Sequence, residues 1–325
     1  RPGGCLMAIL EARGIRKFFR QGGGPWRRGR AIKAVDGVDL AVERGETIGL
    51  VGESGCGKST LARAIIRLVE PDEGTVRLDG IDFLALRGAA LRRARRRIQM
   101  VFQDPYSSLN PRLSVGETIG EGIRIHRLAR GRAVGDRVAE ILGKVGLPPA
   151  AAVRYPHEFS GGQRQRIGIA RALAVEPEIV IADEPVSALD VSVQAQIVNL
   201  LEDLQRDLGL TYVFIAHDLG VVEHVSDRVA VMYLGRIVEE APTAGLFAEP
   251  LHPYTIGLLA SIPRPDPSAP RARAAIAGDV PSPAAVPPGC PFHPRCPLAF
   301  ERCRIERPVL RGRDGDRAVA CWLYG

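Results

Sequence analysis

The stretch GESGCGKST, residues 52–60, decides how the rest of the chain is interpreted. It fits the pattern G-x-x-x-x-G-K-[ST], in which a glycine-rich loop joins a strand to a helix. The preceding TIGLVG (Thr47–Gly52) is a short apolar run closed by glycine, and residues 59–69 predict a helix. The flanking sequence therefore supplies the context that a phosphate-binding loop requires.

Each residue type in this loop has a physical reason. Gly52, Gly55 and Gly57 allow the backbone to curl until successive N–H groups point at phosphate oxygens. A helix that begins near Lys58 adds the positive end of its dipole. We expect Lys58 to reach the β- and γ-phosphates of a nucleotide and the Ser59 hydroxyl to bind Mg²⁺. The predicted ATP-binding residues of the loop are Gly52, Glu53, Ser54, Gly55, Cys56, Gly57, Lys58, Ser59 and Thr60, with the Cys56 thiol only filling space.

A second chemical signal follows the apolar strand candidate IVIAD, Ile179–Asp183. Carboxylates at the C-terminal end of a strand lie where ligands gather in α/β sheets. We expect Asp183 to hold Mg²⁺ through water, and Glu184 to act as general base toward the attacking water. An apolar strand followed by Asp-Glu is a weak signal alone, but beside a phosphate loop it is a strong one.

The composition is that of a globular protein, with 46% hydrophobic and 25% charged residues in a chain of 325. No apolar run approaches the roughly 18 to 20 residues needed to cross a bilayer. The opening RPGGCLMAIL lacks the apolar region of a secretory signal, so we expect an intracellular protein that does not span the membrane. Met7 is a candidate true start, in which case Cys5 is not native.

The net charge of +7 is compatible with a nucleic-acid partner, with an anionic membrane surface, or with solubility alone. The densest basic run is LRRARRR, residues 91–97. It is expected to form either the solvated face of a helix or a contact with acidic lipid headgroups. The charge therefore does not select a partner by itself.

Strand and helix signals alternate along most of the chain, which predicts an α/β fold with a largely parallel sheet. YVFIAH (Tyr212–His217) is a further buried-strand candidate. Strand signals stop between Asp104 and Phe159, where helical spacing predicts a helical insert around Val134, Val138, Ile141, Leu142 and Val145. A second apolar stripe with helical spacing, expected in the core, comprises Val193, Ile197, Leu200, Leu201, Leu204 and Leu208.

The composition changes toward Pro, Ala, Ser and Arg from Pro263 to Gly289, which predicts an extended linker. We therefore expect a nucleotide-binding domain over residues 8–240, with a helical subdomain at about 104–160. Residues 241–289 are the expected linker, which includes the LHPY segment, and 290–325 a four-cysteine C-terminal extension.

The stretch FSGGQRQR, Phe159–Arg166, resembles the signature of the ATPase subunits of ABC transporters, which is usually LSGGQ. Phe159 replaces the leucine, one apolar residue for another. Ser160 can cap the helix that follows, and Gly161 and Gly162 leave its N-terminus bare for phosphate. The resemblance implies that Ser160, Gly161, Gly162 and Gln163 contact the nucleotide of a partner ATPase, so that two subunits close around two ATP molecules. It implies an ABC-type P-loop NTPase: a RecA-like core with an antiparallel β subdomain and a helical subdomain, plus the small cysteine-containing extension.

Further positions match this family in order. Gln103, after IQMVF, resembles the Q-loop glutamine, which contacts Mg²⁺ and water and reports to the membrane subunit. Ser187–Asp190 resembles the D-loop, with Asp190 near the nucleotide. His217 resembles the switch histidine that orients the γ-phosphate and Glu184. Phe19, in preference to Phe18, falls where the family stacks an aromatic ring on adenine.

Other stretches resemble the oligopeptide and dipeptide importer ATPases: VFQDPYSSLNPR (Val101–Arg112), EPVSALDVSVQAQIVNLL (184–201) and LHPYT (Leu251–Thr255). ESGCGKST and SGGQRQRIGIARAL resemble the second of that system's two paired ATPases. The resemblance implies ATP-driven peptide import at the cytoplasmic face of the cell membrane, as a peripheral subunit. The implied partners are a paralogous ATPase subunit, two transmembrane permease subunits and, indirectly, an extracytoplasmic solute-binding protein, without nucleic acid. Close relatives move nickel or sugars, so the cargo stays open.

The chain concentrates its cysteines near the end, where Cys290, Cys296, Cys303 and Cys321 are separated by five, six and seventeen residues. This spacing matches neither the paired C-x-x-C of common zinc sites nor a ferredoxin run. In a reducing compartment four thiolates can bind an iron–sulfur cluster or zinc, or remain free. The resemblance favours a [4Fe-4S] cluster, with zinc as the alternative. Either would staple a proline-rich tail that has no core of its own.

Two other classes of protein remain as alternatives. A soluble ABC protein that acts on ribosomes or DNA would usually carry two cassettes or a long coiled coil, and neither is visible in the sequence. A nucleotide sensor without catalysis is expected to lack Glu184 or His217, and both are present.

Overall fold

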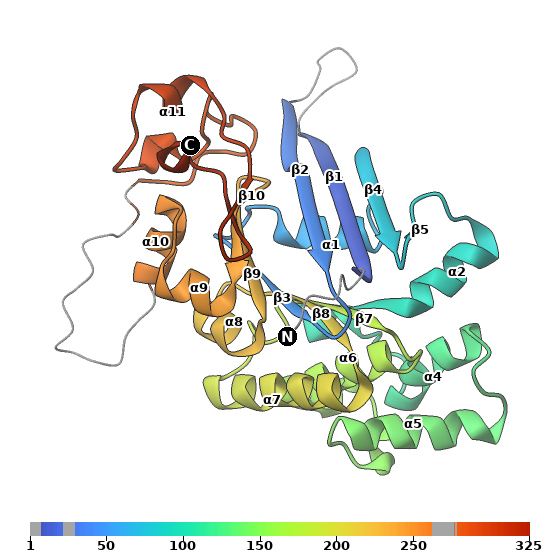
Figure 1. The fold of residues 1–325 in the computed structure, drawn as a ribbon. Helices are drawn as coiled ribbons and strands as arrows, with labels where there is room; N and C mark the ends of the chain where they lie inside the picture. The colour runs from blue at the N-terminus through green and yellow to red at the C-terminus, as the bar shows by residue number, and fades with distance from the viewer. Residues whose placement is uncertain (1–7, 22–29, 262–275, 277) are drawn as a thin grey trace. The chain divides into compact units, whose positions relative to one another are not determined.

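The computed structural model describes residues 8–21, 30–261, 276 and 278–325 (Figure 1). The expectations for Cys5 and Met7, and for residues 262–275 and 277 of the predicted linker, lie outside these residues. The chain divides into two compact units. The first unit comprises Arg1–Leu10, Val42–Thr47 and Arg77–Ile215, and the second unit comprises Glu11–Ala41, Ile48–Val76 and Ala216–Gly325.

The first unit is built from short buried strands and a set of helices. Its strands are β5 (Ile81–Asp82), β6 (Ile98–Val101), β7 (Ile179–Asp183) and β8 (Thr211–Ile215). Its helices are α2 (Gly88–Arg97), α3 (Pro105–Ser108), α4 (Val115–Ile125), α5 (Arg132–Lys144), α6 (Gly161–Leu173) and α7 (Val191–Leu208), with 3-10 turns η1 (Pro149–Val153) and η2 (Pro156–Glu158).

The core of this unit is a parallel arrangement of β6, β7 and β8. The register places Ile98 beside Ile179, and Ile179 beside Thr211. Every residue of β7 and β8 is buried, which is the pattern of strands covered on both faces. Helix α6 contacts β6 and α7, and α4 packs against both α5 and α6. The C-terminal ends of β7 and β8 are thereby fixed on a rigid support.

The second unit contains the longer strands and the end of the chain. Its elements are β1 (Leu10–Gln21), β2 (Arg30–Val42), β3 (Thr47–Val51), α1 (Lys58–Ile65), β4 (Glu73–Leu78), α8 (Leu219–Val225), β9 (Arg228–Tyr233), β10 (Arg236–Pro242), α9 (Thr243–Ala248), α10 (Pro253–Ala260), η3 (His293–Arg295), α11 (Glu301–Ile305), β11 (Arg311–Arg313), β12 (Arg317–Val319) and η4 (Trp322–Tyr324). A few terminal residues of β1, β2, β3 and β4 belong to the first unit.

Two sets of strands organise the second unit. In one, β1 lies between β2 and β4. In the other, β3 pairs with β9 in parallel, and β9, β10, β12 and β11 follow in antiparallel order. The end of the chain therefore adds two strands beside β10, and Figure 1 shows α11 and the C-terminus in this part of the fold. Helix α9 packs on β9 and β10 and contacts α8.

Most of the predicted elements are confirmed. β3 and β7 cover the predicted strands, and no strand occurs between Asp104 and Phe159 in the described chain. The five apolar residues proposed for the helical insert are all buried. The basic run lies on α2, none of whose residues is buried, which fits both the solvated face and the lipid contact expected for it.

One prediction of helix extent and one of core position were partly wrong. The predicted helix over residues 59–69 ends at Ile65, because Arg67 takes a φ of 59° and the chain turns. In the stripe on α7, Ile197, Leu201 and Leu204 are buried, but Leu208 is 42% exposed at the last residue of the helix. No helix among the described residues combines the length and the apolar character needed to cross a membrane.

Candidate functional site

The predicted phosphate loop runs from the end of β3 to the start of α1, inside the second unit. Gly52 has a φ of 150° and Gly57 a φ of 110°, a region that favours glycine. A Cβ on Gly52 would lie 2.2 Å from the Met232 carbonyl oxygen, and one on Gly57 would lie 2.1 Å from the Ala34 carbonyl oxygen. Any larger residue at Gly52 or Gly57 would therefore collide with neighbouring backbone, so the path of the loop depends on these two glycines.

The Lys58 side chain lies inside this loop and binds its backbone. Its side chain is buried, and Nζ donates hydrogen bonds to the carbonyl oxygens of Gly52 at 2.7 Å and Glu53 at 3.2 Å. Burial raises the pKa of the neighbouring Cys56 thiol, so this side chain is a neutral filler beneath the loop. The loop therefore presents a buried ammonium group beside backbone that can receive an anion.

Glu53 is held by two residues from far along the chain. The Glu53 N–H donates to the Tyr254 hydroxyl at 2.8 Å. Arg295 donates from Nη1 to Oε2 at 2.8 Å and from Nη2 to Oε1 at 2.9 Å, a bidentate ion pair. No sequence signal indicated this pairing, since the residues are 201 and 242 positions away. Tyr254 did lie inside the LHPYT stretch, and Arg295 directly before Cys296.

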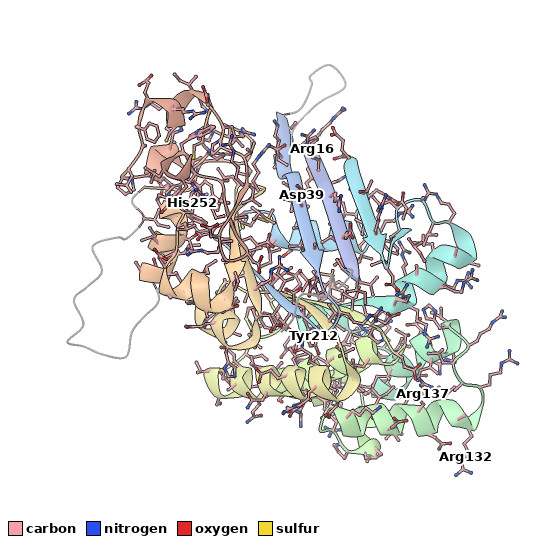
Figure 2. The ribbon with its side chains drawn as sticks, in the orientation of Figure 1. Arg16, Asp39, Arg132, Arg137, Tyr212 and His252 are labelled. Atoms are coloured by element: carbon pink, nitrogen blue, oxygen red, sulfur yellow. The ribbon has the colours of Figure 1, made fainter. Side chains whose placement is uncertain are left out.

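His252 anchors the same region. Its Nδ1 accepts the Tyr254 N–H at the start of α10, and its ring makes a hydrogen bond to the backbone of Ala320. Complete burial lowers the pKa of His252 to about 3, so the ring is neutral at physiological pH. Figure 2 shows His252 between α10 and the segment that carries the C-terminus. This histidine has a structural role, and it lies in the LHPYT stretch already noted in the sequence.

The predicted catalytic carboxylates lie in the first unit at the end of β7. Asp183 is fully buried. Glu184 adopts a φ of 47°, uncommon for a residue other than glycine, and its N–H donates to the Ile215 carbonyl at 2.9 Å. Gln103 Nε2 donates to Glu184 Oε2 at 2.9 Å. The structure thus brings Gln103 and Glu184 together, although 81 residues separate them.

The predicted signature residues form the start of α6 in the same unit. Ser160 Oγ accepts the Gln163 N–H at 3.3 Å, and Gln163 Oε1 accepts the Ser160 N–H at 3.1 Å, a complete capping box. A Cβ on Gly162 would lie 2.5 Å from Val193 Cγ1 at the start of α7. Asp190 is the exposed residue that precedes α7. The N-terminal end of α6 and the predicted D-loop are therefore neighbours.

The remaining predicted residues lie in the second unit. Phe19 lies on β1 with 41% of its surface exposed, and the Lys17 ammonium is 5.7 Å from its ring centroid. The adjacent Phe18 N–H is bound by the Asp72 carboxylate at 2.6 Å. His217 follows β8 and is exposed, next to Asp218, which caps α8 by accepting the Gly220 N–H. Ser59 and Thr60 are on the first turn of α1, and Ser54 and Gly55 are on the loop before it.

The four cysteines of the extension are within electrostatic range of one another. Burial, together with the neighbouring Cys303, Cys321 and Cys296, raises the pKa of the Cys290 thiol to about 11. Cys290 N–H also donates to the Cys303 carbonyl at 2.8 Å. Four thiols are chemically suited to a soft metal. Within the described parts of the chain, however, no group of three or more His, Cys, Asp or Glu side chains is arranged to hold a metal ion.

Comparison with protein families places these features together. The protein-family model described as "ABC transporter" matches residues 35–187. A second family model, "Oligopeptide/dipeptide transporter, C-terminal region", matches residues 238–303. The chain is 54% identical to a "probable peptide ABC transporter ATP-binding protein" of Sinorhizobium fredii, over 97% of this chain and 89% of the relative. The chain belongs to the family of ABC transporter ATP-binding proteins.

Other members of this family agree. The oligopeptide transport ATP-binding protein AppF of Bacillus subtilis is 52% identical over 97% of both chains. Among solved structures, a dimeric ATP-binding cassette in a post-hydrolysis state with ADP and Pi matches with a TM-score of 0.64 and 32% identity, covering 72% of this chain and 99% of that one. CbiO1 of Clostridium perfringens matches with a TM-score of 0.64 and 28% identity, covering 75% of this chain and 92% of that one. The expected ABC ATPase fold is confirmed.

Proposed function

We propose that the chain is the ATP-hydrolysing subunit of an ABC importer for dipeptides or oligopeptides, bound at the cytoplasmic face of the cell membrane. The observation that carries the proposal is the extent of the similarity. It covers the cassette and continues through the oligopeptide/dipeptide transporter region at residues 238–303. The relatives that match over nearly the whole chain are named for peptide or oligopeptide transport.

The phosphate-binding half of the mechanism belongs to the loop over residues 52–60. Its backbone N–H groups and the start of α1 would receive the β- and γ-phosphates, with the Lys58 ammonium beside them. For this, Nζ must exchange its bonds to the Gly52 and Glu53 carbonyls for phosphate oxygens. Phe19, exposed on β1, would stack on the adenine.

The hydrolytic half belongs to the end of β7. Glu184 would accept the proton of the attacking water, and the Gln103 amide, 2.9 Å from its carboxylate, would hold it in place. His217 would orient the γ-phosphate. Ser59, Gln103 and Asp183 would hold Mg²⁺, which neutralises charge on the phosphate oxygens.

The signature segment acts on a second nucleotide. Ser160, Gly161, Gly162 and Gln163 present an exposed, capped helix end, and this end is a suitable receptor for a γ-phosphate from a partner subunit. Asp190, in the loop that contacts this end, would also meet the nucleotide. A dimeric cassette among the structural relatives supports this pairing.

The complex would contain further subunits. We propose a paralogous ATPase as the second cassette and two transmembrane permease subunits as the pathway. An extracytoplasmic solute-binding protein would deliver the peptide, and no nucleic acid would take part. In this arrangement the helices of the insert, α4 and α5, are available to a permease because they carry no predicted nucleotide contact.

For the extension we propose a structural [4Fe-4S] cluster, with zinc as the alternative, held by Cys290, Cys296, Cys303 and Cys321. The mutual electrostatic effect of these thiols supports a shared site. Since the thiol pKa values of Cys290 and Cys321 are raised, metal binding would release protons and depend on pH. Bound metal would crosslink segments that have little apolar core. Anaerobic purification followed by metal analysis separates iron, zinc and no metal.

The proposed function is tested by isolating the chain with its membrane partners. We expect integral membrane proteins to co-purify with it, and peptide bound to the solute-binding protein to stimulate ATP hydrolysis. A nickel or sugar ligand would redirect the cargo assignment, since close relatives carry such solutes. Co-purification of nucleic acid or ribosomes, without membrane proteins, would contradict the proposal.

A further inference from the structure

Glu53, the second residue of the phosphate loop, has all its main polar groups engaged. Its N–H donates to Tyr254, its carbonyl accepts from Lys58 and from the Cys56 N–H, and both carboxylate oxygens accept from Arg295. Two of these partners come from α10 and from the C-terminal extension. The position of the loop therefore depends on segments more than 200 residues away in the sequence.

The Arg295 side chain is almost completely buried where it meets Glu53. Only 6% of its side chain is exposed, against 25% for Glu53. The guanidinium, which is always charged in proteins, makes a bidentate pair with the Glu53 carboxylate. A buried guanidinium requires a partner, and the structure provides the carboxylate of the loop.

The segment that carries Arg295 is fixed by an aromatic cluster. The ring centroid of Phe292 lies 5.4 Å from both Tyr233 and Tyr254, and 5.7 Å from His252. Tyr233 and Tyr254 are 4.6 Å apart. These rings are nearly completely buried, and such pairs hold their members in defined geometry. The packing of Phe292 thereby holds the backbone of Arg295, three residues further on, in a defined position.

The pairing has an electrostatic consequence for a loop that binds an anion. Glu53 brings a carboxylate into the loop, and a carboxylate near a triphosphate opposes binding. Arg295 neutralises that charge and holds the carboxylate away by a two-point bond. Tyr254 fixes the backbone N–H of the same residue, so the loop stays in one conformation before nucleotide arrives.

We propose that Arg295 and Tyr254 are positioning residues of the phosphate loop, through which the C-terminal extension sets the affinity for ATP. The inference rests on the proposed ATPase function, and it assigns to the extension a role in nucleotide binding. The extension acts by neutralising and immobilising Glu53. It contributes no group to the nucleotide itself.

The test compares full-length R295M with wild type and with R304M, in the complex with the partner subunits. Methionine keeps an unbranched apolar stem and removes the guanidinium, and Arg304 is an exposed arginine of the same extension without the Glu53 contact. We expect R295M to raise the KM for ATP roughly ten-fold, within the usual range of coupling between two sites, with kcat nearly unchanged. R304M should leave both values unaltered.

The double variant R295M/E53Q separates positioning from mere structural damage. Removing the orphaned carboxylate should recover at least about three-fold of the lost affinity, since the repulsion disappears with it. Unchanged KM in R295M, or a loss that E53Q does not relieve, would overturn the proposal. Thermal unfolding of each variant shows whether the fold persists.

A second variant keeps the proposal testable if R295M fails to fold. Y254F retains the ring in the aromatic cluster but removes the acceptor of the Glu53 N–H, and we expect a KM for ATP raised about three-fold. Equal KM values for Y254F and wild type would count against the proposal. A fluorescent ATP analogue measures binding to the isolated full chain. If wild type binds it but the complex hydrolyses no ATP, the proposed function fails while the positioning role is still measured.

Discussion

The phosphate loop and the C-terminal extension are held in place by opposite means. The loop is encoded locally: nine consecutive residues, 52–60, supply its glycines, its lysine and the start of its helix. The extension is held by distant contacts, such as Arg295 with Glu53 and Arg307 with Asp36, which lie 242 and 271 residues apart. Local encoding makes the loop recognisable in a single sequence, whereas the attachment of the extension is visible only in the folded chain.

Mutations in the two regions are also expected to change different properties of the protein. Residues at the nucleotide are expected to govern binding and turnover with little effect on stability. Residues that attach the extension are expected to govern stability, and through Glu53 the affinity of the loop. Four variants test this difference between the two regions.

E184Q should have the largest effect on turnover. We expect kcat for ATP hydrolysis to fall roughly 100- to 10,000-fold, because the amide cannot accept the proton of the attacking water. ATP binding should persist, since the amide oxygen of the introduced glutamine can still accept the hydrogen bond from Gln103. The matched control is E140Q, on the surface of α5, where the carboxylate pairs with Lys144. Normal turnover in E184Q would refute the role of this carboxylate as the base.

K58A should act on binding itself. Loss of the ammonium removes a charged donor to the phosphates, and we expect ATP affinity to fall roughly 10- to 150-fold. Isothermal titration with a non-hydrolysable ATP analogue measures the change. K144A, which removes a surface lysine of α5, serves as control and should bind normally. Equal affinity in K58A and K144A would contradict the assignment of the loop.

E239Q should lower stability without affecting the chemistry. The fully buried Glu239 carboxylate accepts the N–H groups of Leu251 at 2.7 Å and His252 at 2.8 Å. Glutamine retains one acceptor and directs its NH₂ group at the other N–H, which we expect to cost about 2 kcal/mol of unfolding free energy. Urea unfolding measures this loss, with the exposed E301Q as control. A stability equal to that of E301Q would show that holding the Leu251–His252 backbone in place does not depend on this carboxylate.

D36N should give the smallest effect, and one that depends on pH. Burial alone would raise the pKa of Asp36, but Arg236, Lys33 and Arg307 outweigh it, and the pKa is lowered. The carboxylate therefore adds stability above its unfolded pKa of about 4, and this contribution is lost as pH falls through the lower folded pKa. We expect D36N to be about 1 kcal/mol less stable than wild type at pH 7, with the difference shrinking below about pH 4.

The control for this pH dependence is D207N, an exposed aspartate of α7. It should match wild type at every pH. A deficit of D36N that stays constant as the pH falls well below about 4 would mean that packing, not charge, attaches Arg307 and the extension.

Much of the fold could be predicted because it is written in runs of local sequence. The buried strands IVIAD and TIGLV are recognisable by their continuous apolar residues, and the structure has them as β7 and β3. The predicted helix after the loop was too long, because nothing in its apolar spacing reveals the positive φ of Arg67. Leu208 fits the stripe of α7 but is exposed at the helix end, a position that periodicity cannot distinguish.

The candidate site was predictable in part for the same reason. Loop, carboxylates and signature each follow a short motif, and the pairing of Gln103 with Glu184 follows from two parallel strands that end together. Arg295 follows no short motif, and the LHPYT stretch that contains His252 and Tyr254 does not reveal their partners. Their importance arises from burial and from partners that the fold supplies, so only the structure reveals them.

We expect ATP hydrolysis by this chain to drive peptide across a membrane. The most direct measurement reconstitutes the complete transporter in liposomes and follows labelled peptide and released phosphate together, for wild type and E184Q. We predict ATP-dependent accumulation of peptide with wild type, and loss of both signals with E184Q. Peptide uptake that continues unchanged in E184Q would show that hydrolysis by this chain does not drive peptide import. ATP hydrolysis that no peptide stimulates, and that moves no peptide, would show the same.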